Sequence, residues 1–421
     1  MKNNLVKIRK ETDYYLAYFN ELRKLIPVNY IGSIIIDSFF NKRFSIREIQ
    51  NFIRQNGRRY NLSSKDIQIF LRQIQDELIL APRGNVRLYQ RELSTPIAVE
   101  IEITTRCNLR CKHCCIKKYD KLMSINRIER IFKLLNEKRV FEISLAGGEP
   151  FVHPQILDIL SLCEQYNFAT IITTNATLLS ESLIKRLAEF KNLAFVVSLE
   201  GIDRTNDIIR GRGVFKKVDQ AVRNLKKNGI YVEISSTITE ENIDRCRELV
   251  EYTKSLDIFC NFNLFKPFKK DHKPYILGPN KYFKFIEDLF EERNFSGAKV
   301  NLPNAGAIFA YLEGQEKCNE CYAIMCAFTI DVEGSIVPCP ALQSAGYYDE
   351  IFLPKFEENF IDIWKNNRHF QDFRKGNLRE CRARSYIFNR NIKRNDPYGI
   401  TAFLRYQKAK SQEVKNKLLN S

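Results

Sequence analysis

Six apolar, strand-like runs alternate with amphipathic stretches between residues 97 and 265, and this repeat constrains the fold more than any other feature of the chain. The strand-like runs are 97–104, 140–146, 169–174, 193–200, 230–238 and 257–265. Between them, stretches such as 125–137, 154–165, 180–190 and 218–228 carry apolar residues at three- and four-residue intervals. Helices that cross over a parallel sheet have this periodicity. The pattern predicts an α/β fold built on a partial (β/α)6 barrel.

Three cysteines follow the first of these strands, where barrel enzymes place their chemistry. Cys107, Cys111 and Cys114 have the spacing C-x3-C-x2-C, which gives the chain enough slack to hold three corners of a cubane iron–sulfur cluster. Three thiolates leave the fourth iron open to a substrate or cofactor. A zinc knuckle or a disulfide is the alternative. Zinc would use His113, but structural zinc sites usually take their ligands from two separated pairs.

Four further motifs follow in chain order. They are Gly147-Gly148-Glu149-Pro150 after the second strand, Asn175 after the third, Ser198 in the fourth, and Arg210 in a basic loop behind it. Together with the cysteines, these motifs resemble those of the radical S-adenosylmethionine (SAM) superfamily, whose core is a (β/α)6 barrel.

The resemblance implies roles for these residues. Gly147, Gly148 and Glu149 would receive the amino group of SAM, and Asn175 would lie near its ribose. Ser198 and Arg210 would contact the ribose hydroxyls and the methionine carboxylate, for which arginine is suited by bidentate hydrogen bonding. His113 occupies the place where the family usually has an aromatic residue that stacks on adenine, and it would stack more weakly.

Residues 1–92 precede the core of 93–265 and are predicted to form a winged-helix-like α+β domain. Strands are expected near 5–9, 14–20 and 24–29, and helices at 32–40, 45–55 and 63–78, with Ser45 and Ser63 as N-caps. This arrangement resembles the RiPP recognition element, which binds the leader of a ribosomally made precursor peptide. The leader would then add a strand to an open sheet edge. A DNA-binding winged helix or a buttress for the barrel is the competing interpretation.

The cysteines return after a connecting segment, 266–316, with one predicted helix at 281–293. Cys326 and Cys339 flank a predicted hairpin with Gly334 at its turn. Residues 317–400 resemble the auxiliary-cluster extension called SPASM, or its shortened form, twitch. The resemblance implies an inner [4Fe–4S] cluster held by Cys326, Cys339, Cys381 and Cys321, with Cys318 as the other candidate fourth ligand. The outer cluster's ligands are missing, since Gly399 stands where the family has its closing cysteine. Residues 401–421 are expected to be a basic tail.

Composition agrees with these interpretations. Twelve cysteines suggest metal ligation in a reduced compartment, and we expect a cytoplasmic protein. The most apolar N-terminal stretch, 26–40, is shorter than the ~20 residues that span a bilayer, so no membrane partner is expected. The 67 Lys and Arg against 50 Asp and Glu give a net charge of +17. This charge favours an acidic peptide or nucleic acid as partner, or is simply a solvated surface. Without an RNA-binding motif, nucleic acid is disfavoured.

The implied function is that of a radical SAM maturase of a ribosomally synthesised peptide, an enzyme that contains two [4Fe–4S] clusters and SAM. A 5′-deoxyadenosyl radical would abstract hydrogen from a precursor residue, and a thioether or carbon–carbon crosslink would follow. A flavodoxin- or ferredoxin-type protein would donate electrons. A peptide epimerase, which would need Cys115 or Cys260 as thiol donor, remains an alternative. A small-molecule twitch enzyme, such as a dehydrogenase or haem-pathway enzyme, is another, and an RNA-modifying enzyme is suggested by charge alone.

Overall fold

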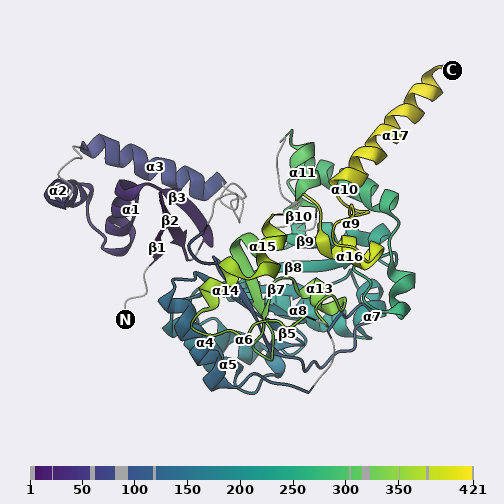
Figure 1. The fold of residues 1–421 in the computed structure, drawn as a ribbon, viewed down its shortest axis with the longest axis horizontal. Helices are drawn as coiled ribbons and strands as arrows, with labels where there is room; N and C mark the ends of the chain where they lie inside the picture. The colour runs from purple at the N-terminus through teal and green to yellow at the C-terminus, as the bar shows by residue number, and fades with distance from the viewer. Residues whose placement is uncertain are drawn as a thin grey trace.

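The six predicted strands form the centre of one parallel sheet in a computed structural model (Figure 1). The structure describes residues 5–20, 22–56, 62–80, 93–116, 120–302, 305–314, 323–349, 351–375 and 379–419. The core strands are β4 (Ala98–Thr104), β5 (Glu142–Gly147), β6 (Ala169–Thr174), β7 (Leu193–Ser198), β8 (Tyr231–Ile238) and β9 (Cys260–Leu264). Each pairs in parallel with the next strand along the chain, so the predicted (β/α)6 core is confirmed.

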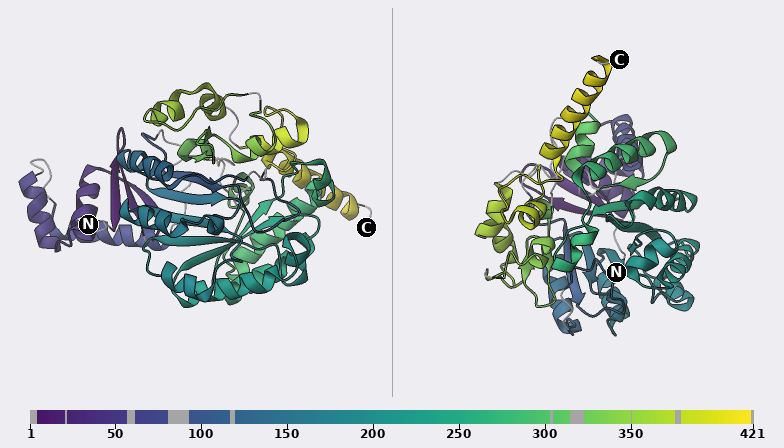
Figure 2. Two further views of the ribbon diagram at one scale, coloured as in Figure 1. Left: turned by 90° about the horizontal axis from the view of Figure 1, so that it is seen from below. Right: turned by 90° about the vertical axis from the view of Figure 1, so that its right-hand side faces the viewer.

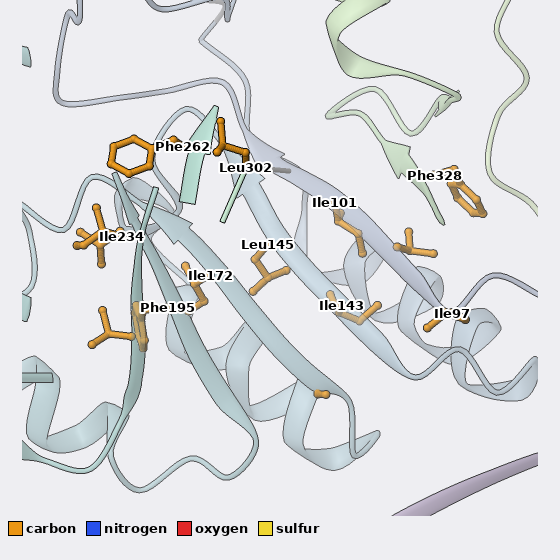
Figure 3. Packing of buried hydrophobic residues seen from close by; sticks show 14 of the residues in the cluster. Ile97, Ile101, Ile143, Leu145, Ile172, Phe195, Ile234, Phe262, Leu302 and Phe328 are labelled. Atoms are coloured by element: carbon orange, nitrogen blue, oxygen red, sulfur yellow. The ribbon is translucent and has the colours of Figure 1, made fainter. Parts of the chain in front are cut away.

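Helices connect these strands and cover the outer face of the sheet. They are α4 (Ile125–Glu137), η3 (Pro150–Val152), α5 (Ile156–Gln165), α6 (Glu181–Leu187), α7 (Arg204–Arg210), α8 (Val214–Lys227), η4 (Ile243–Arg245) and α9 (Cys246–Ser255). Figure 3 shows Ile101, Ile143, Leu145, Ile172 and Phe195 in the apolar core that the strands share. Because strand side chains alternate between faces, the opposite face of β4 carries Glu100 and Glu102, which are only half-buried.

The sheet is wider than the sequence predicted, because strands from outside the core extend both of its edges. β10 (Val300–Asn301) pairs in parallel with β9, and β11 (Ala327–Ile330) pairs in parallel with β4. β12 (Ile336–Val337) forms with β11 the antiparallel hairpin that was predicted around Gly334. An edge strand presents unpaired backbone groups, and β11 satisfies those of β4. The predicted C-terminal extension is thus continuous with the barrel sheet.

The N-terminal region has the six predicted elements. They are β1 (Val6–Lys10), β2 (Tyr15–Phe19), β3 (Lys24–Val28), α1 (Tyr30–Ile36), which continues as η1 (Asp37–Asn41), α2 (Ile46–Asn56) and α3 (Ser64–Leu80). The antiparallel sheet has the order β1-β2-β3. Both predicted N-caps are confirmed as reciprocal capping boxes, Ser45 with Glu48 and Ser63 with Asp66.

One face of this small sheet packs on its own helices, and the other packs on the barrel at the amino ends of the core strands (Figures 1 and 2). Tyr18 stacks on Phe141 with ring centroids 5.1 Å apart and donates a 2.9 Å hydrogen bond to Glu142. The buried Arg9 donates to the carbonyls of Thr95 and Pro96 at the entry to β4. The N-terminal domain is therefore attached to the end of the barrel opposite the cysteine loop.

The remaining helices follow the core. They are η5 (Lys270–Tyr275), α10 (Pro279–Ser296), α11 (Gly306–Leu312), α12 (Ala323–Cys326), α13 (Pro340–Ser344), α14 (Phe360–Asn366), α15 (Arg368–Arg374), α16 (Arg382–Asn389) and α17 (Ile400–Leu419). The helix predicted at 281–293 is α10. The expected basic tail, 401–421, lies mostly in the helix α17, whose far end projects from the body of the protein (Figures 1 and 2). Within the described ranges, we find no helix of the length and apolarity that a membrane span requires.

Candidate active site

The cysteine loop begins where β4 ends and is held against the turn that follows β5. The N–H of Gly148 donates to the carbonyl of Thr104 at 2.7 Å, and that of Glu149 donates to the carbonyl of Arg106 at 2.8 Å. A Cβ atom on Gly147 or on Gly148 would clash with these same two carbonyls, and Gly147 has a φ of +130°. Two glycines are therefore required because the two backbones approach too closely for any side chain.

Glu149 links the same turn to β6. Its carboxylate accepts hydrogen bonds from the hydroxyl of Thr174 at 2.7 Å and from the backbone N–H groups of Asn175 at 2.7 Å and Phe151 at 3.1 Å. Burial raises the pKa of Glu149, while these three bonds oppose the rise. A carboxylate has about four acceptor positions, so Glu149 retains the capacity to accept a further bond from a cationic ligand.

The three cysteines of the loop are half-buried, and hydrogen-bond donors reach the sulfurs of Cys107 and Cys111. The backbone N–H of Leu109 lies 3.4 Å from Cys107 Sγ, and Asn175 Nδ2 lies 3.9 Å from the same atom. Burial raises the pKa of the Cys111 thiol, and the neighbouring Cys114 and Cys107 raise it further. Three mutually close thiols supplied with donors fit an iron–sulfur cluster, whose potential depends on hydrogen bonds to its sulfurs.

A buried ion pair lies beside these cysteines. Arg210 donates from Nε and Nη2 to one carboxylate oxygen of Glu200, at 3.0 and 2.5 Å, and its Nη1 lies 3.8 Å from Cys111 Sγ. The other oxygen of Glu200 accepts from the N–H of Thr237 at 2.6 Å. His113 Nε2 lies 3.4 Å from Glu200, and burial lowers the pKa of His113 to about 4, so this imidazole is neutral near pH 7.

The residues expected to contact SAM all lie around the carboxyl ends of the core strands, as Ser198 does at the last position of β7. The side chains of four of them already have protein partners, as described above for Glu149 and His113. Asn175 donates to Asn108 at 2.9 Å and faces Cys107, while Arg210 is paired with Glu200. Glu200 belongs to none of the motifs recognised in the sequence. The only feature of the sequence that could have indicated a role for Glu200 is its position, two residues beyond β7 and ten residues before Arg210.

The second cysteine group lies where the hairpin and two helices meet. Cys326 ends α12 and directly precedes β11, whereas Cys339 and Cys381 are the residues at the N-caps of α13 and α16. Burial raises the pKa of Cys339 to about 11 and the nearby Cys381 raises it as well, while the backbone N–H groups of Leu342 and Ala341 oppose the rise. These donors suit a thiolate ligand. The expected fourth ligand, Cys321, and its alternative, Cys318, lie outside the described residues.

Buried polar contacts surround Cys381 and Gly399, the position where the family has its closing cysteine. The carboxylate of Glu380 accepts from the N–H groups of Asp396 and Thr401, both at 3.1 Å, and a Cβ on Gly399 would clash with it. The fully buried Arg384 donates to Asp396 at 2.6 Å, and the N–H of Cys381 donates to the same carboxylate. The Cys381 loop is thus fastened by polar side chains.

The other cysteines of the chain differ in their surroundings. Cys163 and Cys246 are buried in helices, as predicted, and Cys260 is fully buried in β9. Cys115 forms a side-chain hydrogen bond with Ser344 at the end of α13, and burial raises its pKa to about 11. In the described part of the chain, no three His, Cys, Asp or Glu side chains converge as ligands of a single metal ion. The ligands of a cubane each bind a different iron, so they need not converge on one point.

Comparison with known proteins agrees with this geometry. Residues 101–253, which span β4 to α9, match the family described as the radical SAM superfamily. This segment, and not the whole chain, is what the family model matches.

Among curated relatives, it is 25% identical over 281 residues to the antilisterial bacteriocin subtilosin biosynthesis protein AlbA of Bacillus subtilis, covering 64% of this chain and 60% of AlbA. It is 28% identical over 168 residues to the mycofactocin maturase MftC of Mycolicibacterium smegmatis, covering 39% of this chain and 43% of MftC. The matches thus span about half the length of these relatives.

Among solved structures, that of SuiB shares the fold along nearly the whole chain. Streptococcus suis SuiB bound to S-adenosylmethionine aligns with a TM-score of 0.66 and 18% identity, covering 94% of this chain and 98% of SuiB. The native anSMEcpe structure with bound AdoMet and the Cp18Cys peptide aligns with a TM-score of 0.60 and 22% identity, covering 77% of this chain and 99% of anSMEcpe.

Proposed function

We propose that the protein is a radical SAM maturase that crosslinks a ribosomally made precursor peptide. The observation that carries the proposal is the set of three thiols, Cys107, Cys111 and Cys114, held beside the close-packed Gly147–Glu149 turn. Three relatives or neighbours support a peptide substrate. AlbA and MftC are described as a bacteriocin biosynthesis protein and a maturase, and SuiB has been solved bound to its precursor peptide SuiA.

Within this proposal, the three cysteines hold a [4Fe–4S] cluster and the surrounding motifs hold SAM. When bound, SAM and the cluster supply a carbon radical that abstracts hydrogen from an unactivated carbon. Glu149 accepts a bond from the amino group of SAM, and Gly148 keeps the backbone close enough for this contact. Asn175 and Arg210 direct N–H groups toward Cys107 and Cys111, and Ser198 and His113 line the ribose and adenine side. Arg210 also offers charge to the methionine carboxylate.

The C-terminal cysteines hold a second cluster, with Cys326, Cys339 and Cys381 as ligands and Cys321 as the fourth. Full ligation by cysteine suits electron transfer, which a crosslink requires because it removes two hydrogens from the peptide. The full burial of Cys260 in β9 leaves it unsuited to donate hydrogen to a substrate radical. This favours crosslinking over epimerisation, for which only Cys115 would remain.

The test is anaerobic reconstitution followed by reaction with SAM, dithionite and the short peptide encoded beside the gene. We expect about eight irons per chain, 5′-deoxyadenosine by chromatography, and a peptide that has lost two hydrogens by mass spectrometry. Cys107→Ala should lose about half of the iron and all deoxyadenosine. Cys163→Ala, which removes a buried cysteine of α5, is the matched control. Retention of full iron and deoxyadenosine formation by Cys107→Ala would overturn the proposal.

A further inference from the structure

A groove runs past the outer edge of β1, between the N-terminal domain and the barrel. It encloses about 750 Å³ and is lined on one side by α1 and η1 and on the other by the segments that precede β5 and β6. Apolar side chains such as Ile8 and Ile34 line part of it, between polar and charged residues. Because residues of both domains contribute, the groove exists only where the two are docked.

Two cations in the groove have no carboxylate partner among the described residues. Lys7 projects from β1 toward the barrel, with Nζ 4.9 Å from the centre of the Phe168 ring. Arg139 donates from Nη1 to the carbonyl of Ile8 at 2.9 Å, which leaves most of its donors uncommitted. The third cation, Lys42, is paired with Asp37 at 3.0 Å. The surroundings of Lys7 are apolar enough that burial lowers its pKa to about 7.

Side chains of the protein occupy part of the outer backbone edge of β1. Asn41 accepts from the N–H of Val6 at 3.1 Å and donates to its carbonyl at 2.8 Å, and Arg139 occupies the carbonyl of Ile8. These contacts obstruct the addition of a strand along β1, so we expect a ligand in this groove to be recognised mainly through its side chains. At the opposite edge of the sheet, β3 contains Pro27, which lacks an N–H donor.

Resting on the proposed function, we infer that this groove binds an acidic, partly apolar segment of the precursor peptide, with one carboxylate seated between Lys7 and Arg139. The apolar lining would take the aliphatic side chains on either side of that carboxylate. Two uncommitted cations suit one or two carboxylates, whereas nucleic acid is bound by a longer row of phosphate contacts. Of the first 92 residues, 17 are Lys or Arg and nine are Asp or Glu, so the domain also attracts an acidic peptide at longer range.

The test measures binding of a fluorescein-labelled 12-residue peptide of alternating glutamate and valine to the full chain, with a glutamine–valine peptide of the same length for comparison. We expect the glutamate peptide to bind at least about tenfold more tightly, and Lys7→Gln to remove most of that difference. All binding is measured at pH 6, below the lowered pKa of Lys7, so that Lys65→Gln removes the same charge from an exposed site on α3 and serves as the matched control. Equal effects of the two substitutions would show non-specific attraction and overturn the inference.

Photocrosslinking locates the peptide independently. Tyr30 lines the groove and is 47% exposed, whereas Ile69 on α3 is 44% exposed and is not among the lining residues. With p-benzoylphenylalanine at each site in turn, we expect crosslinks from position 30 only. Crosslinks from position 69 alone would place the peptide elsewhere and overturn the groove assignment. Deoxyadenosine and precursor modification, measured on the same preparations, report separately on the proposed function.

Discussion

Substitution of Glu200 by glutamine tests whether the buried pair with Arg210 holds the cysteine loop in place. Both side chains are nearly inaccessible, at 0% and 9% exposure, and Glu200 accepts from Arg210 and from the backbone of β8 at once. A glutamine has one acceptor oxygen, so its amide nitrogen would face the Thr237 N–H or Arg210, and the guanidinium charge would be left without compensation.

Breaking a buried ion pair by removing one partner costs about 3–5 kcal/mol. For a unit of 150–250 residues, each kcal/mol lowers the melting temperature by about 2–4 °C, so a loss of at least about 6 °C is expected. Urea and thermal unfolding of the cluster-free protein measure this effect without the contribution of iron.

The matched control is Glu248→Gln in the exposed pair that Arg245 forms with Glu248, at 2.8 and 2.9 Å. An exposed pair contributes about 0–1 kcal/mol even where its hydrogen bonds are short. If Glu200→Gln destabilises the protein no more than Glu248→Gln does, the buried pair does not hold the cysteine loop in place. A second readout is the potential of the reconstituted loop cluster. It should change in Glu200→Gln, because Arg210 Nη1 is no longer held beside Cys111, and stay unchanged in Glu248→Gln.

Three further perturbations follow from the contacts described. Gly148→Ala should lower the melting temperature and weaken SAM binding in calorimetry, because a Cβ there clashes with the Arg106 carbonyl. The control Gly278→Ala should be tolerated, because its Cβ meets nothing within 4 Å. Equal melting temperatures and SAM affinities of the two variants would contradict this prediction. Lys7→Met should stabilise the protein more at pH 6 than at pH 9. The pKa of Lys7 is lowered to about 7 in the folded protein, so its charge lowers the free energy of unfolding most below that pH and progressively less toward pH 10.5. Urea titrations that show no increase in the free energy of unfolding of Lys7→Met at pH 6 would refute this prediction. Glu102→Gln should stabilise the folded protein by at most about 3 kcal/mol at pH 8 and have little effect at pH 4.5. Burial and the nearby Glu100 and Asp331 raise the pKa of Glu102 to about 7, so ionisation of Glu102 above that pH is unfavourable in the folded state. A gain in stability at pH 4.5 as large as that at pH 8 would contradict this prediction.

The sequence by itself determined the core and its order. Strands show alternating β-branched and polar residues, and helices show apolar residues at three- and four-residue intervals. Both patterns involve only residues that are close in the chain, so β4 to β9 and the six N-terminal elements could be located from the sequence alone. The cysteine loop and the Gly147–Glu149 turn were each placed after a core strand, and they meet because the carboxyl ends of parallel strands lie at one edge of the sheet.

Tertiary structure alone decided contacts between segments far apart in the chain. β11 completes the edge of β4 across more than 220 residues, although its four residues carry no signal of that pairing. Glu200 is fixed by a partner from α7 and another from β8, and the groove beside β1 is formed by two domains. No local pattern encodes such contacts, because each depends on which buried charges and open edges the completed fold brings together.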